Sequence, residues 1–194
     1  LYAVYNKFFN DTSGSDCSDG QGLCTVYEKA LRWQQKNRET KRDIDSLRNL
    51  SVGYDNIAQV YVELGEVENL QKARKMYERS LRIAEFTAEK DPSEERKREL
   101  SISYNNMGGV CQKMGGEQNF RIAYEMYEKG LRIAETLADK QGSEESLSDL
   151  ITSLHRKGDA CSDQAGEQNL QTAQAMYEKA LHIAELLAER VKTG

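Results

Sequence analysis

Proline is almost missing from this sequence, with one residue among 194. Because proline removes a backbone donor and clashes with the preceding helical turn, its scarcity leaves long helices possible. Histidine is also rare, with two residues, and neither has a cluster of cysteine or carboxylate residues at zinc-ligand spacing around it. No run of about 18 apolar residues occurs, so the sequence predicts no membrane-spanning helix. We therefore expect no metal site, no cofactor and no membrane insertion.

A basic tract is missing too, and the net charge is −5, which disfavours nucleic acid as a partner. Four cysteines are too few for a disulfide framework in a chain of this length. Cys111 and Cys161 lie 50 residues apart and are interpreted as small buried hydrophobic residues. Cys17 and Cys24 lie in a polar loop segment and would form a local bridge if oxidised. We expect reduced thiols and a cytoplasmic protein, without a visible signal peptide.

What the chain does contain is good helix formers, with 38% hydrophobic and 30% charged residues. The apolar share is below the roughly 45–50% of ordinary globular domains. The apolar residues nevertheless recur at helical spacing, which argues against disorder. The composition favours an elongated all-helical protein.

One pattern recurs every 50 residues: MYERSLRIAE begins at Met76, MYEKGLRIAE at Met126 and MYEKALHIAE at Met176, and VYEKALRWQQ begins at Val26. A second block begins at Leu50, Leu100 and Leu150, and LYAVYNKFFN at the start of the chain fits it with one residue of slippage. The repeats run over about 1–40, 41–90, 91–140 and 141–194. Each holds two helices, predicted over 1–12 and 24–39, 42–64 and 69–89, 94–114 and 119–139, and 144–164 and 169–191.

Turn and cap residues support these boundaries. Ser93 and Ser143 each precede a Glu-Glu pair, as helix N-caps do, and Thr40 stands three residues before Asp43 in a capping-box arrangement. The glycines at 65, 115–116 and 166 mark the turn between the two helices of a repeat. Three asparagines are predicted N-caps of the second helices: Asn69, Asn119 and Asn169.

A single helix pair cannot bury its apolar face, whereas stacked pairs bury it against their neighbours. The predicted fold is therefore all-α, an α-solenoid of about four antiparallel helix pairs forming one array over residues 1–194. The last helix keeps Leu186, Leu187 and Val191 apolar, although the outer face of a terminal repeat is normally polar. This indicates a piece of a longer array, or an end covered by another molecule through end-to-end homo-association.

The repeat resembles the tetratricopeptide repeat. Tyr54, Ala58, Tyr61, Ala73 and Tyr77 follow its order of aromatic and small residues, and the next two repeats follow it 50 and 100 residues later. In this pattern a small residue lets the two helices approach and the aromatics fill the space beside it, so the tyrosines at 77, 127 and 177 are expected in the core. The period is longer than the family's usual ~34 residues, and in this the chain is similar to the long-helix repeats of kinesin light chains and of bacterial multi-repeat regulators.

The resemblance implies a right-handed superhelix that binds ligands on its concave face, lined by the first helix of each repeat. The inward positions transferred by register, with one further turn supplying Lys113, are Asn6, Asn10, Asp55, Gln59, Asn105, Gly109, Lys113, His155 and Asp159. Amides offer a donor and an acceptor, which an extended peptide requires, so Asn105 is the first candidate and Asn6 the second. Gly109 leaves a gap for a partner side chain.

These features predict a non-catalytic scaffold that binds a protein or peptide, with no nucleophile and base at catalytic spacing. The aspartates of the inward row favour a mixed or basic ligand. Two alternatives stay open: a structural spacer that self-assembles through its ends, or a regulatory segment of a larger enzyme.

Overall fold

The structure is a computed structural model that describes residues 41–164 and 166–193. The chain divides into two compact units, Leu1–Asn49 and Leu50–Gly194. Of the first unit the described part is the beginning of one helix, so the architecture below is that of the second. The predictions that fall on residues 1–40, including Asn6, Asn10, Cys17 and Cys24, lie outside the described residues.

The described residues form six α-helices and no strand. Their bounds are α3 Lys41–Leu64, α4 Val67–Lys90, α5 Glu94–Met114, α6 Glu117–Gln141, α7 Glu144–Ser162 and α8 Glu167–Thr193. The all-helical class is therefore confirmed for this part of the chain. None of these helices is apolar enough over sufficient length to cross a membrane.

Glycine turns connect the two helices of each repeat. Gly65, Gly115 and Gly116 have φ values of 67°, 69° and 83°, in the left-handed region that glycine adopts without steric cost. Because the backbone reverses within these residues, the second helices begin at once, and the predicted asparagine N-caps are wrong. Asn119 lies inside α6, where its Nδ2 donates to the Gly115 carbonyl at 2.7 Å.

Between repeats, serine N-caps begin the first helices as predicted. The Ser93 hydroxyl accepts from the backbone N–H of Arg96, and the Ser143 hydroxyl accepts from that of Ser146 at 3.2 Å. Each satisfies one of the N–H groups left free at the start of a helix. The sequence thus locates the beginning of α5 and α7 correctly.

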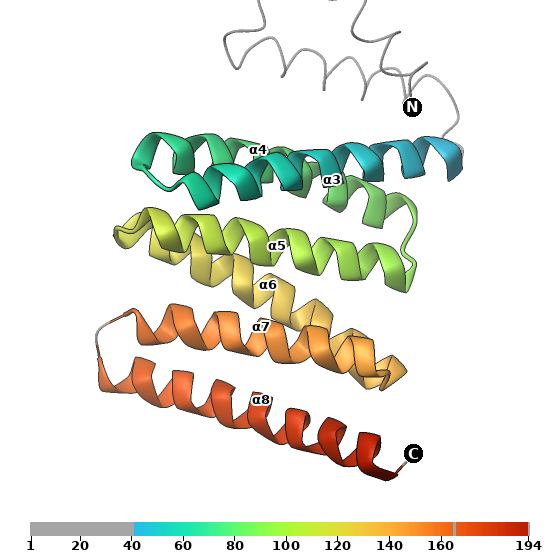
Figure 1. The fold of residues 1–194 in the computed structure, drawn as a ribbon, viewed down its shortest axis with the longest axis vertical. Helices are drawn as coiled ribbons and strands as arrows, with labels where there is room; N and C mark the ends of the chain where they lie inside the picture. The colour runs from blue at the N-terminus through green and yellow to red at the C-terminus, as the bar shows by residue number, and fades with distance from the viewer. Residues whose placement is uncertain (1–40, 165, 194) are drawn as a thin grey trace, which may run out of the picture. The chain divides into compact units, whose positions relative to one another are not determined.

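Successive helices pack against one another in chain order: α4 with α5, α5 with α6, α6 with α7, and α7 with α8 (Figure 1). The first helices α5 and α7 also contact each other directly. One core cluster joins Tyr77 of α4, Met107 and Val110 of α5, and Tyr127 of α6. A second joins Leu131 of α6 to Leu154 of α7 and Ala180 of α8. The buried seam therefore passes from each repeat into the next.

Within a repeat, a tyrosine ring of the second helix lies directly against a glycine of the first. A Cβ atom added at Gly108 would come within 2.6 Å of Cε1 of Tyr127, and one at Gly158 would come equally close to Tyr177. The predicted close approach at a small residue is confirmed. Tyr77 and Tyr127 are buried, as expected for the core, and Tyr177 of the last repeat is half-buried.

The fourth repeat places Lys157 at the register of Ile57 and Met107, and this lysine is 8% exposed. Its ammonium forms an ion pair with Glu128 and lies 5.0 Å from the ring centroid of Tyr124. Burial lowers the pKa of Lys157. Both contacts come from α6, so the substitution converts an apolar contact between repeats into an ionic one.

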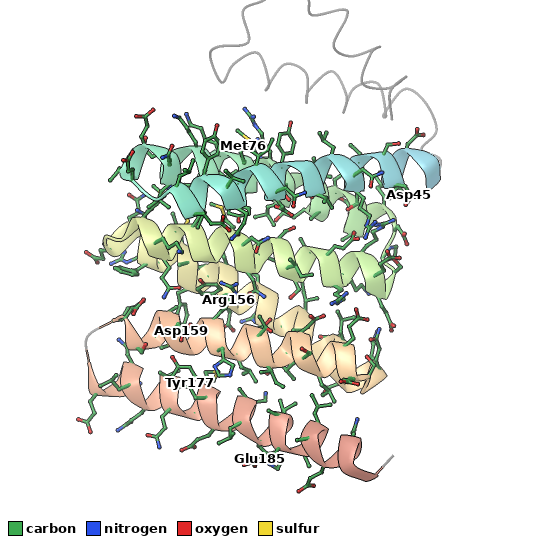
Figure 2. All side chains as sticks on the ribbon, viewed as in Figure 1. Asp45, Met76, Arg156, Asp159, Tyr177 and Glu185 are labelled. Carbon is green, nitrogen blue, oxygen red and sulfur yellow. The ribbon has the colours of Figure 1, made fainter. Side chains whose placement is uncertain are left out.

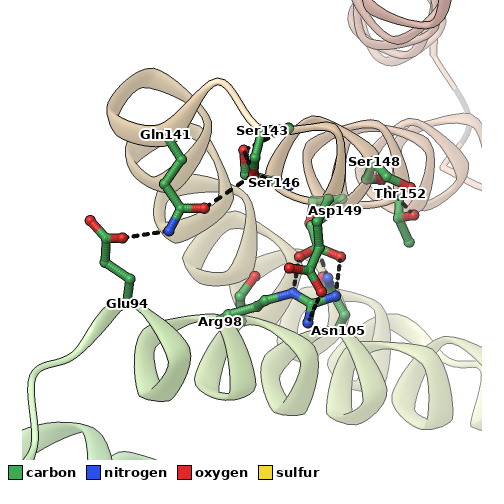
Figure 3. Close-up of polar contacts among 12 residues, drawn as sticks. Glu94, Arg98, Asn105, Gln141, Ser143, Ser146, Ser148, Asp149 and Thr152 are labelled. Atoms are coloured by element: carbon green, nitrogen blue, oxygen red, sulfur yellow. Dashed lines mark hydrogen bonds and ion pairs between the residues drawn. The ribbon is translucent and has the colours of Figure 1, made fainter. Parts of the chain in front are cut away.

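Polar side chains also join neighbouring repeats at the end where α5 and α7 begin (Figure 3). The Arg98 guanidinium of α5 pairs with the carboxylates of Asp149 and Glu145 of α7. At the same end, the Gln141 amide of α6 donates to Glu94 of α5 at 2.5 Å, which is a contact within one repeat. The hydrogen bond that Arg98 donates to Asp149 raises the pKa of Arg98. The two Arg98 ion pairs therefore join α5 to α7.

Candidate functional site

The candidate face is the side of the protein formed by the first helices α3, α5 and α7. Gln59, Lys113, His155 and Asp159 are exposed on it, as the register predicts for ligand-binding positions. Asp55 is half-buried, and burial raises the pKa of its carboxyl group, opposed by a hydrogen bond with Ser80. Asp55 is consequently less accessible than the other four.

Asn105, the first candidate from the sequence, is only 7% exposed. Its Nδ2 donates to the Ser153 hydroxyl of α7 at 3.0 Å, and its Oδ1 faces the Cα of Gly130 in α6. Because α7 covers this position, the Asn105 amide connects α5 to α7 and is closed to a ligand. Register placed this residue on the same row as Gln59 and Asp159, but it could not show that the next repeat covers it.

Three tyrosine hydroxyls, 50 residues apart in sequence, lie along this face. The Tyr77 hydroxyl donates to Gln59 Oε1 at 3.2 Å, that of Tyr127 to Gln112 Oε1 at 2.8 Å, and that of Tyr177 to Asp159 Oδ1 at 2.7 Å. Each ring is packed in or beside the core, so its hydroxyl needs a polar partner at the edge. The tyrosines thereby hold one acceptor side chain of each first helix in place.

The middle repeat differs because Gly109 occupies the register of Gln59 and Asp159. Without a side chain there, Tyr127 turns to Gln112, and the Arg156 guanidinium of α7 reaches across to the vacant position. A Cβ atom at Gly109 would lie 3.4 Å from Nη1 of Arg156 and 3.6 Å from the Tyr127 hydroxyl. Figure 2 labels Arg156 and Asp159 on α7, and Tyr177 on α8 below them.

Arg156 also hydrogen-bonds the Tyr127 hydroxyl. Burial raises the pKa of this hydroxyl to about 12, and the charge and hydrogen bond of Arg156 oppose that rise. The guanidinium is exposed and has a neutral phenol as its neighbour. Its remaining N–H donors face solvent, where a carbonyl or carboxylate of a ligand would meet them.

Three carboxylates take part in side-chain hydrogen bonds along this face. Asp163 accepts from the Gln112 amide at 2.5 Å, Asp159 accepts from Tyr177, and Gln59 donates to Glu63 at 3.0 Å. We call Gln59, Gln112, Lys113, Arg156 and Asp159 the polar face. It offers acceptors at both ends and donors in the middle.

Gln112 and Arg156 are the two members of the polar face that the sequence interpretation did not include among its site residues. The hydroxyl of a buried tyrosine needs a polar partner. The position of Tyr127 in the second helix therefore predicts an acceptor side chain near the end of the first helix, where Gln112 lies. His155 lies beside this face with its ring centroid 5.6 Å from that of Tyr177. Among the described residues, no three side chains of the metal-ligating types gather into a group.

No protein-family model and no curated protein sequence matches the chain. Among solved structures it is similar to one described as "DHF58 filament", with 18% sequence identity and a TM-score of 0.55, covering 100% of this chain and 95% of that one. Another, "DHF119 filament", has 14% identity over 97% of this chain and 98% of that one, with a TM-score of 0.48. The first likeness identifies the class of fold, an all-helical repeat protein.

Proposed function

We propose that this protein is a non-catalytic scaffold, a solenoid of tetratricopeptide-like helix pairs that binds a protein or peptide segment along its polar face. The observation that carries the proposal is the row of side chains positioned by three tyrosine hydroxyls at 50-residue spacing. Hydrogen bonds between Tyr77 and Gln59, Tyr127 and Gln112, and Tyr177 and Asp159 preorganise this row. Preorganised groups bind with less loss of side-chain entropy than free ones.

The ligand that fits is an extended or helical peptide with a carbonyl or carboxylate opposite Arg156 and basic or amide groups on either side. Glu63, Asp159 and Asp163 favour the basic groups, and the Arg156 guanidinium beside Gly109 supplies the donors for the carbonyl or carboxylate. The polar face contains no side chain positioned as a nucleophile beside a general base, which supports binding without chemistry.

The test is selection from a displayed library of random linear peptides on the purified 194-residue protein. Enriched peptides are then measured against two variants, Arg156→Ala and Gly109→Gln. The glutamine is the residue that repeat two carries at this register, and its Cβ would make ordinary contacts. Arg121→Ala on α6 removes the same charge elsewhere and serves as the matched control.

We expect both variants to weaken binding while the control leaves it unchanged. Loss of a hydrogen bond to a charged group is worth about 1.5–3 kcal/mol, so Arg156→Ala should weaken binding by at least about tenfold. Enrichment of no peptide, or equal binding to all three variants, would remove the polar face from consideration.

A further inference from the structure

A cavity lies between the two second helices α4 and α6, and α5 contributes to its wall. Its volume is about 530 Å³, within the range of about 300–1,000 Å³ that is usual for ligand sites. All of its lining residues belong to the unit Leu50–Gly194, and none belongs to the polar face. We call this cavity the α4–α6 groove, and six of its lining residues carry the argument: Glu85, Glu89, Leu100, Arg132, Ile133 and Lys140.

The two sides of the α4–α6 groove carry opposite charges. Glu85 and Glu89 form an acidic row on α4, because residues four apart lie on the same face of a helix. Arg132 and Lys140, two such steps apart, form a basic row on α6. All four side chains are exposed. In the part of the chain that the structure describes, the side chains of Glu89 and Lys140 form no hydrogen bond or ion pair, so their charges are available to a ligand.

The rest of the groove surface is mainly apolar, with the half-buried Leu100 of α5 and Ile133 of α6. No asparagine or glutamine is among the described residues that line it, and each of these residues belongs to a helix. Such a surface offers few partners for the N–H and C=O groups of an extended peptide. A helix pairs its own backbone groups and presents only side chains. The groove therefore suits a helix, whereas the amides of the polar face suit an extended segment.

The corresponding gap in the next repeat is bridged by side chains of the protein itself. Glu135, the counterpart of Glu85, pairs with Lys179 of α8 at 2.6 Å. Arg190 of α8 donates through Nη1 to the Gly142 carbonyl, just after the end of α6, at 3.1 Å. These contacts connect α6 to α8 along the surface where α4 and α6 have the groove between them.

One substitution accounts for this difference. Tyr104 of α5 stands where α7 has Leu154, and its hydroxyl donates to Glu85 at 2.9 Å. The ring of Tyr104 also lies 5.5 Å from the ammonium of Lys129, measured to the ring centroid. Lys129 has the same register as the lysine that bridges the next gap. The phenol thus takes the place of the ion pair between second helices, and no such pair closes the α4–α6 groove.

We propose that the α4–α6 groove is a second protein-binding surface, occupied by an amphipathic α-helix of a partner protein. The apolar stripe of this helix packs on Leu100 and Ile133. Basic residues on one flank of the stripe face the acidic row of α4, and acidic residues on the other flank face the basic row of α6. A ligand helix of this kind has its apolar anchors at i, i+4 and i+7.

The test measures binding of synthetic peptides of about four helical turns, or roughly 15 residues, to the purified 194-residue protein by fluorescence anisotropy. A hydrocarbon staple on the outer face holds each peptide helical, which lowers the entropy lost on binding. All peptides carry leucine at i, i+4, i+7 and i+11. The mixed peptide has lysine on one flank and glutamate on the other. Comparison peptides have lysine on both flanks, glutamate on both flanks, or the mixed flanks with serine in place of leucine.

We expect the mixed peptide to bind about three- to tenfold more tightly than either single-sign peptide. Each single-sign peptide places like charges against one side of the groove. The preference should shrink as salt is added, because the charged rows are exposed. The serine peptide should lose binding, since it has no apolar side chain for Leu100 and Ile133.

Matched variants of the protein locate the binding. Arg132→Glu combined with Lys140→Glu makes both sides of the groove acidic, so the preference should switch to the lysine peptide. Lys75→Glu combined with Arg121→Glu changes the net charge equally, at exposed positions of the same two helices that do not line the groove. This control should keep the preference for the mixed peptide. Circular dichroism verifies that both variants retain their helix content.

Four results would overturn the proposal. These are no binding of the mixed peptide to the unmodified protein, equal affinity for the mixed and single-sign peptides, binding of the serine peptide as tight as that of the mixed peptide, or an unchanged preference in the groove variant. Arg156→Ala should leave binding of the mixed peptide unchanged, because Arg156 does not line the groove. Weaker binding by Arg156→Ala would locate the helix on the polar face instead, so this proposal and the proposed function fail independently.

Discussion

The Cα of Gly108 lies against the ring of Tyr127, so close that a Cβ atom at this position would come within 2.6 Å of Cε1 and 2.8 Å of Cδ1. The ring itself is 1% exposed and cannot move outward without leaving the core. This contact sets how closely α5 and α6 approach, and the same contact recurs between Gly158 and Tyr177.

Replacing Gly108 with alanine should therefore destabilise the protein. Overpacking a core costs about 1–3 kcal/mol, and alanine recovers up to about 1 kcal/mol through its helix propensity, so we expect a net loss of about 1–2 kcal/mol. Chemical denaturation monitored by circular dichroism measures it. Gly53→Ala is the control, because nothing lies within 4 Å of a Cβ there, and it should stabilise by about 0.5–1 kcal/mol. Equal effects at both positions would contradict the packing argument.

Much of this helical arrangement was predictable, because helix boundaries depend on local signals. The bounds of α5, Glu94–Met114, are the predicted ones. The Ser93 hydroxyl caps the start of the helix, and Gly115 ends it with a positive φ. The second helices begin two residues earlier than predicted: α4 starts at Val67 in place of residue 69. Glu66 adopts a φ of 54°, which no feature of its side chain indicates, so the turn is more compact than the asparagine pattern suggested.

The candidate face was less predictable, because exposure depends on neighbours distant in sequence. Asp55, Asn105 and His155 share one register but are half-buried, buried and exposed respectively. The difference arises because α7 covers Asn105, whereas His155 lines a cavity between α7 and α8 that no described residue fills. A repeat pattern specifies which residues are equivalent, and the position of each repeat within the stack decides which of them a ligand can reach.

Lys157→Met restores the residue that the preceding repeat carries at this register, Met107. We expect the variant to be as stable as the original protein or more so, because a well-packed apolar residue often equals or exceeds a buried ion pair. Glu128→Gln should instead destabilise by about 1–2 kcal/mol, since it leaves the buried ammonium without its counter-ion. The expected loss is smaller than for a fully buried pair because the Glu128 side chain is 30% exposed. Thermal denaturation of the two single variants and the double variant separates these effects, and a strong destabilisation by Lys157→Met would refute the interpretation.

Arg98 connects α5 to Asp149 and Glu145 of α7 at a partly exposed site, with 38% of its side chain exposed. Solvent screens such pairs, so Arg98→Ala should cost less than about 1 kcal/mol. The cost should shrink as salt is added. Arg98→Met keeps the apolar stem and serves as the control for lost packing. Denaturation at low and high ionic strength measures the difference, and a salt-independent loss of several kcal/mol would instead assign Arg98 a buried structural role.

Alkaline pH should destabilise the protein through two tyrosines. Burial raises the pKa of Tyr104 to about 12, helped by the hydrogen bond that its hydroxyl donates to Glu85, and burial raises that of Tyr127 to about 12 as well. In the unfolded chain these groups ionise near their ordinary pKa of 10.0. Between these values the folded state binds more protons than the unfolded state, so the free energy of unfolding falls as pH rises. Below pH 10 the two groups contribute no pH dependence.

The measurement is denaturation at a series of pH values, with tyrosinate absorbance followed in parallel. Tyr104→Phe keeps the ring and removes one ionising group, so the slope of stability against pH in this range should become shallower than that of the unmodified protein. Tyr124→Phe is the control, because Tyr124 is exposed and lies at the surface beside Lys157. If tyrosinate formed completely near pH 10 while the helices stayed intact, the hydroxyls would be accessible to solvent and the buried hydrogen bonds of Tyr104 and Tyr127 would be refuted.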